Sequence, residues 1–258
     1  MCTRTARTLA CWVTAVLLTG FAPSPAFAGA DGKAVAEGER IFGQYCSGCH
    51  GDTGEGSTLK AWFLSIEPRD LTKGIFKLRS TPRGTLPTDE DLHRTITYGI
   101  LRSAMPQYRR LTGPERDAVV AYIKTLSDRW KAEGPGEPIT IPDPPEDLMS
   151  KASVARGQEV YTLLQCGSCH GPLGRGDGTL NKNPGGGMSS EGQPPANLRR
   201  GIYKSGDTEK GLYRAVMTGL DGSSMHAFGS LFAAGEGKRI GPSDAWHLVA
   251  YVLSLRGL

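Results

Sequence analysis

The chain has 258 residues, of which 38% are hydrophobic and 22% are charged, with a formal net charge of +4. This length suffices for one or two domains with their own cores, and the composition excludes a membrane-embedded bundle, a coiled coil and an α-solenoid. The 35 glycines and 17 prolines predict many loops and turns. Because the sequence shows no clustered basic stretch, the small positive charge does not indicate a nucleic-acid partner.

Residues 1–28 have the pattern of a secretory signal peptide. Basic residues precede a mostly apolar run from Leu9 to Ala22, and Ala26-Phe27-Ala28 fits the small-x-small rule for cleavage. The alternative is a membrane anchor, but about fourteen apolar residues fall short of the roughly 20 that span a bilayer. We therefore expect cleavage after Ala28 and a mature protein in the periplasm.

Four cysteines remain in the mature sequence, and four cysteines in an oxidising compartment commonly form two disulfides. Here they belong to the segments Cys46-Ser47-Gly48-Cys49-His50 and Cys166-Gly167-Ser168-Cys169-His170. C-x-x-C-H is the attachment signature of c-type haem: the two thiols bond the macrocycle and the adjacent His ligates the iron. A thioredoxin-like pair or half of a zinc site shares the C-x-x-C spacing but does not require the His.

The two motifs therefore predict two covalently attached haem c groups. The cofactor-binding residues are Cys46, Cys49, Cys166 and Cys169, and the first iron ligands are His50 and His170.

The chain also contains an internal repeat, in which Cys46 and Cys166 stand 120 residues apart. The matching segments are 38–42 with 157–161, 68–77 with 195–204, 92–96 with 212–216, and 120–123 with 249–252. The repeat predicts a domain at 29–127 and a second at 154–258. A Pro-rich linker, 128–153, joins them as a semi-rigid extended segment.

On these residues the mature chain resembles the class I, His/Met cytochromes c, present twice as in the periplasmic two-domain dihaem cytochromes c. The resemblance implies an all-α fold in which each domain holds a few helices and long loops around one covalent haem. We expect helices near 34–45 and 114–126, the second capped by Thr112. The resemblance implies that they cross where Gly38 meets the turn bearing Tyr122. In the second half, Gly157, Tyr161 and Tyr251 stand at the positions of Gly38, Phe42 and Tyr122.

The resemblance further implies a Met as the sixth iron ligand, on a loop well after each haem motif. Met105 follows Gly99 by six residues, and Met225 follows Gly219 by the same spacing. The two methionines are also 120 residues apart, as the haem motifs are. Met105 and Met225 are therefore the predicted sixth ligands.

The second half departs from the family pattern after its Met. Pro106 follows Met105, whereas His226 follows Met225. His226 therefore remains an alternative ligand, and imidazole in place of thioether would lower the potential of the second haem. Met188, in a Gly-rich loop of the second half, is a further alternative. The remaining groups are expected to have no ligand role: His93, His247, Met149 and Met217.

These residues predict a periplasmic electron carrier that exchanges electrons with redox proteins as donors and acceptors, rather than an enzyme. One alternative is a cytochrome subunit of a larger oxidoreductase, with peripheral association to a membrane respiratory complex. Another is a dihaem enzyme of the peroxidase or thiosulfate dehydrogenase type. A Met ligand in both halves argues against the first of these enzymes, and the lack of a spare mature Cys argues against the second.

Overall fold

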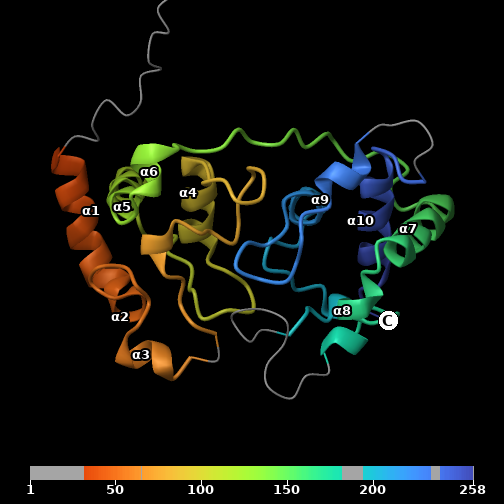
Figure 1. The fold of residues 1–258 in the computed structure, drawn as a ribbon, viewed down its shortest axis with the longest axis horizontal. Coiled ribbons are helices and arrows are strands. Elements are labelled where there is room, and N and C mark those ends of the chain that lie inside the picture. Colours follow the sequence, from red (N-terminus) through yellow and green to blue (C-terminus); the bar gives the residue numbers. More distant parts are fainter. Residues whose placement is uncertain (1–31, 65, 182–193, 234–238, 258) are drawn as a thin grey trace, which may run out of the picture.

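The computed structural model describes residues 32–64, 66–181, 194–233 and 239–257, so the predicted signal peptide and Met188 lie outside the described residues. Two helical halves lie side by side, the first on the left and the second on the right of the view (Figure 1). The described residues form helices and loops, with one isolated bridge between Leu86 and Pro135 and no strand. The predicted all-α fold is confirmed.

The helices follow the internal repeat. The first half contains α1 (Gly32–Tyr45), α2 (Ser47–His50), α3 (Leu59–Trp62), η1 (Leu71–Lys73), α4 (Asp89–Tyr98) and α5 (Gly113–Thr125), and α6 (Arg129–Ala132) follows. The second half contains α7 (Lys151–Leu163), α8 (Gly167–His170), η2 (Thr179–Asn181), η3 (Leu198–Arg200), α9 (Glu209–Thr218), η4 (Gly229–Phe232) and α10 (Asp244–Ser254). Within the described ranges, none of these helices has the length and apolar character to cross a membrane.

Each half is built on one close crossing of two long helices. A Cβ atom added to Gly38 of α1 would overlap the carbonyl oxygen of Ala118 and lie 2.9 Å from Cβ of Tyr122 on α5. The crossing of α7 and α10 is equivalent, because a Cβ on Gly157 would overlap the carbonyl oxygen of His247. Only glycine permits this approach. The predicted crossing at Gly38 is therefore confirmed.

Side-chain caps fix where the helices begin. Thr112 Oγ1 accepts a hydrogen bond from the Glu115 N–H, and Glu115 Oε2 accepts one from the Thr112 N–H at 2.7 Å. Thr88 and Asp91 form the same reciprocal box at the start of α4. Such boxes satisfy amide groups that have no partner within the helix. The box at Thr112 starts α5 one residue before its predicted beginning at residue 114.

The connector between the halves is anchored at both ends. Trp130 of α6 is buried in the first core and Leu148 in the second. Between them, the Gly136 N–H donates to the Leu86 carbonyl at 3.0 Å. In Figure 1 the connector runs in green along one edge from α6 to α7. These contacts tie the predicted linker to the surface of the molecule.

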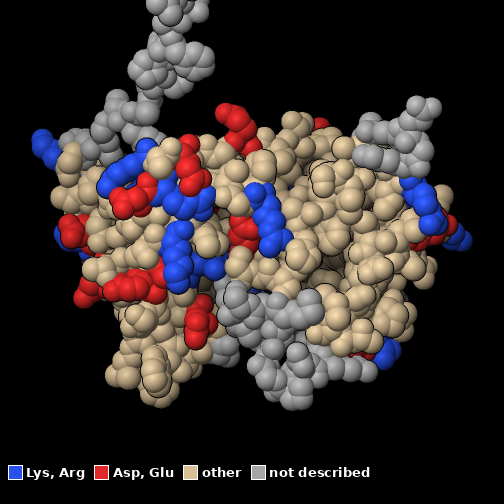
Figure 2. All heavy atoms as spheres, in the orientation of Figure 1, with Lys and Arg blue, Asp and Glu red and all other residues tan. Residues whose placement is uncertain are grey.

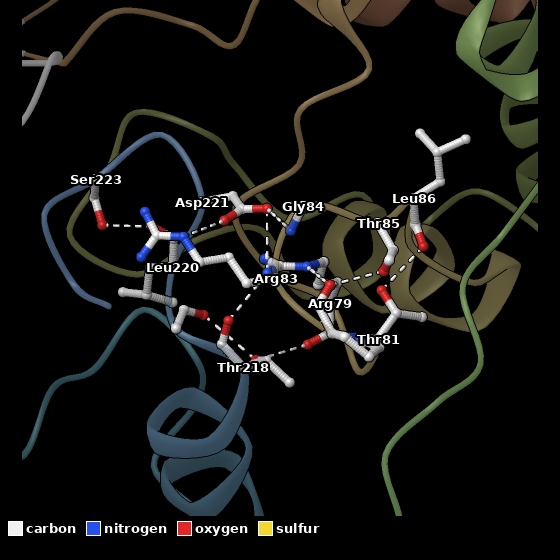
Figure 3. Close-up of polar contacts among 12 residues, drawn as sticks. Arg79, Thr81, Arg83, Gly84, Thr85, Leu86, Thr218, Leu220, Asp221 and Ser223 are labelled. Carbon is white, nitrogen blue, oxygen red and sulfur yellow. Dashed lines mark hydrogen bonds and ion pairs between the residues drawn. The ribbon is translucent and has the colours of Figure 1, made fainter. Parts of the chain in front are cut away.

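A buried ionic cluster joins the halves directly (Figure 3). The side chain of Arg79 is fully buried, and its Nη2 lies 3.1 Å from Asp221 Oδ2 and donates to the Thr218 carbonyl at 3.0 Å. Asp221 also accepts from the Gly84 N–H at 3.0 Å and pairs with Arg83 Nε at 3.4 Å. Because every one of these contacts links the first half to the second, the cluster fixes their relative position.

Candidate functional site

Each C-x-x-C-H motif folds into one helical turn. In the first half α2 follows α1 directly, so that Cys46, Cys49 and His50 stand at positions i, i+3 and i+4 of a helical turn and share one side of it. The turn ends where Gly51 adopts a φ of +79°, and Gly171 ends the second motif at +80°. Glycine adopts this conformation without steric cost. The sequence spacing thus becomes a compact group of two thiols and an imidazole.

The described residues enclose one cavity in each half around these groups. The first cavity is lined by Cys46, Cys49, His50 and Met105, and the second by Cys166, Cys169, His170 and Met225. Apolar side chains at matching positions of the repeat form the walls: Leu92, Ile96, Val119 and Ile123 in the first, and Leu212, Val216, Leu248 and Val252 in the second. All eight residues predicted to bind a cofactor therefore line these two cavities.

A backbone carbonyl orients each motif histidine. His50 Nδ1 lies 3.0 Å from the Arg69 carbonyl oxygen, and His170 Nδ1 lies 2.9 Å from that of Ala196. A carbonyl only accepts hydrogen bonds, so Nδ1 carries the hydrogen. Burial lowers the pKa of both imidazoles, which favours the neutral ring. The lone pair on Nε2 is then available to a metal ion.

Burial disfavours the thiolate form of the first cysteine in each motif. Burial raises the pKa of Cys46 to about 11 and that of Cys166 to about 12. The four described cysteines form no disulfide with one another. A thiol-disulfide exchange site needs a thiol with a lowered pKa, because the thiolate is the nucleophile. The environment therefore argues against a thioredoxin-like redox pair.

The two predicted Met ligands lie on loops with the same hydrogen bonds. The Ile100 N–H donates to the Met105 carbonyl at 3.1 Å, and the Met105 N–H donates to Ser103 Oγ at 3.1 Å. The second loop repeats both contacts around Met225, at 3.0 and 3.3 Å. These bonds hold each Met backbone at the cavity, so the equal Gly-to-Met spacing corresponds to equal loop structure.

The alternative ligand His226 has another partner. Its Nδ1 lies 3.0 Å from Arg83 Nη1, and the residue is exposed although it also lines the second cavity. Because a guanidinium only donates, Nδ1 of His226 accepts, and the hydrogen of the neutral ring is on Nε2. In that state neither ring nitrogen offers a free lone pair. The contact favours Met225 over His226.

The other groups considered in the sequence make structural contacts or stand apart from the cavities. His93 Nε2 lies 2.9 Å from Asp117, and His247 Nδ1 lies 2.9 Å from Ser153 Oγ on α7. Met217 packs against the second core, whereas Met149 is 53% exposed. Neither histidine nor Met149 lines either cavity.

Comparison with known families assigns one match to each half. Residues 33–123 match the family model described as cytochrome C oxidase, cbb3-type, subunit III, and residues 154–256 match the cytochrome c family. This chain belongs to the dihaem cytochromes c. The two cytochrome c domains bind two haem c groups covalently, and such domains carry electrons.

Two relatives span nearly the whole cytochrome. The chain is 27% identical over 243 residues to the cbb3-type cytochrome c oxidase subunit CcoP of Rubrivivax gelatinosus, a match that covers 93% of the chain. It spans only 61% of that relative. A chain of the reducing HAO-like protein complex of Kuenenia stuttgartiensis is similar in structure, with a TM-score of 0.75 and 32% identity. That match covers 85% of this chain and 96% of the other.

The residues at the two cavities fit the haem that the family implies. Each cavity presents two thiols that form no disulfide, an imidazole whose Nδ1 is already hydrogen-bonded, and a Met on a hydrogen-bonded loop. Apolar walls surround them, as a largely apolar macrocycle requires. His50 and His170 would hold the iron from the motif side.

Sequence reasoning missed the residues that one half contributes to the other. Arg102 of the first half lines the second cavity, and Lys204 of the second half lines both cavities. The Arg69 carbonyl accepts the hydrogen bond from His50, and Arg69 Nη2 also donates a hydrogen bond to the Asp221 carbonyl at 3.2 Å. The repeat matches Lys77 with Lys204, but a repeat gives no information about contacts between its copies.

Proposed function

We propose that this chain is an exported dihaem electron-transfer protein that exchanges one electron per haem with redox proteins. The observation that carries the proposal is the composition of each cavity: two thiols, an imidazole with Nε2 available, and a Met from a hydrogen-bonded loop. When bound, haem supplies a reversible one-electron iron couple whose potential a Met ligand raises.

The chain's own residues favour electron exchange over catalysis on a bound substrate. The carbonyl partners of His50 and His170 orient each imidazole, and the loop hydrogen bonds hold the backbones of Met105 and Met225 at the cavities. These four side chains would provide two ligands to each iron. A peroxidase needs an open position, so this donor set supports the carrier over the enzyme.

The arrangement of the halves supports transfer between the two sites. Both cavities share Lys204 as a lining residue, so their walls meet at the junction of the halves. The Met loops also lie at this junction (Figure 1). Electrons arriving at one site could therefore leave from the other without a change in the buried contacts that join the halves.

The partners are redox proteins, and the surface charge does not select one. On the face in Figure 2, cationic and anionic side chains are interspersed over the first half, and the second half is largely uncharged. There is no large area of one sign on this face to steer a partner. A second candidate role, subunit of a larger oxidoreductase complex, is favoured by the names of both relatives, which describe parts of complexes.

Haem content tests the proposed function. Protein made in a host that attaches c-type haem should carry two haems per chain, resistant to acid–acetone extraction. The double variant Cys166→Ala, Cys169→Ala should carry one, whereas Ser168→Ala, between the same two thiols, should keep two. Recovery of fewer than two haems from the unmodified chain would remove the basis of the proposal.

Native extracts distinguish the carrier from the subunit. A free periplasmic carrier should be released by osmotic shock and migrate alone in size-exclusion chromatography. A subunit should sediment or co-migrate with other redox proteins in a defined ratio. Retention in the cytoplasmic fraction would contradict the proposed export, which rests on residues 1–28.

A further inference from the structure

The two Met loops differ at one backbone-restricted position. Gly222 adopts a φ of +71°, and the residue at the same place in the first loop, Arg102, adopts a φ of +60°. Glycine takes this conformation freely, whereas a residue with a side chain is strained in it. Such strain persists where the surroundings hold it and is concentrated at functional sites. The first half thus keeps an arginine at a position where its own repeat has glycine.

The side chain of Arg102 reaches the other half of the molecule. Arg102 lines the second cavity together with His170 and Ala196. Within the described residues its guanidinium has no hydrogen bond or ion pair. A positive charge from the first half therefore stands at the second cavity.

The first cavity also has an arginine beside the Met loop of the other half, but this arginine is Arg69, which does not itself lie on a Met loop. Arg69 lines the first cavity, and a Cβ atom on Gly222 would overlap its guanidinium. The repeat pairs Arg69 with Ala196, and Arg102 with Gly222. Where the second half has a small residue, the first half supplies the arginine. Each cavity consequently has one arginine at this contact, and both arginines come from the first half.

A fixed positive charge beside a haem stabilises the reduced iron, which carries one positive charge fewer than the oxidised iron. It therefore raises the reduction potential. We infer that the first domain supplies Arg102 to the second haem site. There the positive charge of its side chain raises the reduction potential of the haem. The inference rests on the proposed function, because it requires a haem in the second cavity. Arg102 is exposed, so salt must weaken its effect.

Potentiometric titration of the holoprotein tests this assignment. Arg102→Gly installs the residue of the second loop and relieves the positive φ, so the loop should keep its structure. We expect one of the two one-electron steps to move to lower potential, and the other to move less. Arg102→Lys retains the charge and should leave both steps near their original potentials. Arg69→Ala, which installs the residue of the second half, should lower the other step.

Two further measurements separate charge from structure. Arg110→Gly removes an equal charge from an exposed residue that lines neither cavity, and it should move neither step. The difference between the unmodified protein and Arg102→Gly should shrink as ionic strength rises. The inference is overturned if Arg102→Gly leaves both steps in place, or if Arg102→Lys shifts them as much. Uptake of fewer than two electrons per chain by the unmodified protein would instead contradict the proposed function.

Discussion

The choice of ligand at each site depends on which lone pairs neighbouring residues leave free. Backbone carbonyls occupy Nδ1 of His50 and His170 and leave Nε2 available. Arg83 has the opposite effect on His226, because it occupies Nδ1 and puts the hydrogen on Nε2. The two thioethers have no such competitor within the loops that hold them. Residue chemistry therefore favours Met105 and Met225 as the sixth ligands.

Replacing one Met by imidazole should change one site alone. A thioether favours ferrous iron, so Met105→His should lower the potential of one haem and remove its weak Met–iron charge-transfer band, whereas the other haem should barely move. Met225→His should do the same at the other site. Near-infrared spectra combined with a redox titration make both measurements. If the unmodified second haem lacks the Met band and His226→Ala gives a high-spin haem, then His226 is the ligand.

The sequence alone predicted the cysteines and histidines of the two motifs, which line the two cavities, because the spacing of thiols and imidazole is the signature of the chemistry. It also singled out both Met positions, through a spacing that repeats. It left His226 open because the deciding partner, Arg83, is distant in the chain and belongs to the other half. Arg102 was missed for a similar reason, since a backbone conformation and a cross-domain cavity have no signature in a single sequence.

At the scale of elements, each half depends on one helix crossing without intervening side chains. Local patterns predicted α1 and α5 well, because an apolar stripe and a capping box determine them. The same patterns could not predict how closely Gly38 approaches the Ala118 carbonyl on α5, because that distance depends on how the two helices pack. The short helices α2, α3 and α8 follow loop and motif geometry rather than periodicity.

Adding one methyl group at the first crossing should destabilise the protein. Gly38→Ala would force the Ala118 carbonyl away and should lower the free energy of unfolding of the holoprotein by about 3 kcal/mol. Gly43→Ala is the matched control on the same helix, because a Cβ there meets nothing within 4 Å. It should raise stability by about 0.5–1 kcal/mol. Equal effects of the two substitutions, measured by urea unfolding, would contradict the close crossing.

An ion pair between α7 and α10 should make stability depend on pH. Arg156 binds Asp244 through Nε at 2.7 Å and Nη2 at 2.9 Å, which lowers the pKa of the Asp244 carboxyl. A lowered folded-state pKa stabilises the protein above the unfolded value of about 3.9, and this stability is lost as pH falls through the folded pKa. Asp244→Asn should therefore cost about 1–3 kcal/mol at neutral pH.

The cost of Asp244→Asn should shrink as pH falls below about 3.9, where the carboxyl of the unfolded chain becomes protonated, and should disappear below the lowered pKa of the folded protein. Urea unfolding at neutral and acidic pH measures the difference. Asp143→Asn is the control, because its pair with Lys210 is exposed and should matter little at either pH. A cost that stays constant with pH would show that the charge of Asp244 is not responsible.

For the whole molecule, the junction between the halves places the two cavities against each other. Arg79 is completely buried, and among the described residues its Nη1 has no hydrogen-bond partner. Asp221 is the carboxylate that compensates its charge. Separate domains joined only by a Pro-rich linker would have no such cluster. The sequence predicted the linker but could not predict this contact, whose members are more than 130 residues apart.

Removing that compensating charge should loosen the junction. Asp221→Asn keeps the shape of the side chain but leaves a buried cation without a carboxylate, which should cost about 3–5 kcal/mol. Calorimetry should then show the two halves unfolding in separate transitions, whereas the unmodified holoprotein should unfold in one. Asp117→Ala, at an exposed contact with His93, should leave the single transition intact. A single unchanged transition in Asp221→Asn would contradict this role for the cluster.

The central claim is that both cavities hold haems that exchange electrons and do not bind a substrate. A potentiometric titration of the holoprotein, followed in the visible and near-infrared, tests it most directly. We expect two reversible one-electron steps and, in the oxidised protein, low-spin spectra with a Met–iron band from each haem. Uptake of fewer than two electrons per chain, or one haem with an open coordination position that binds an added ligand such as cyanide or carbon monoxide without displacing Met, would contradict the account.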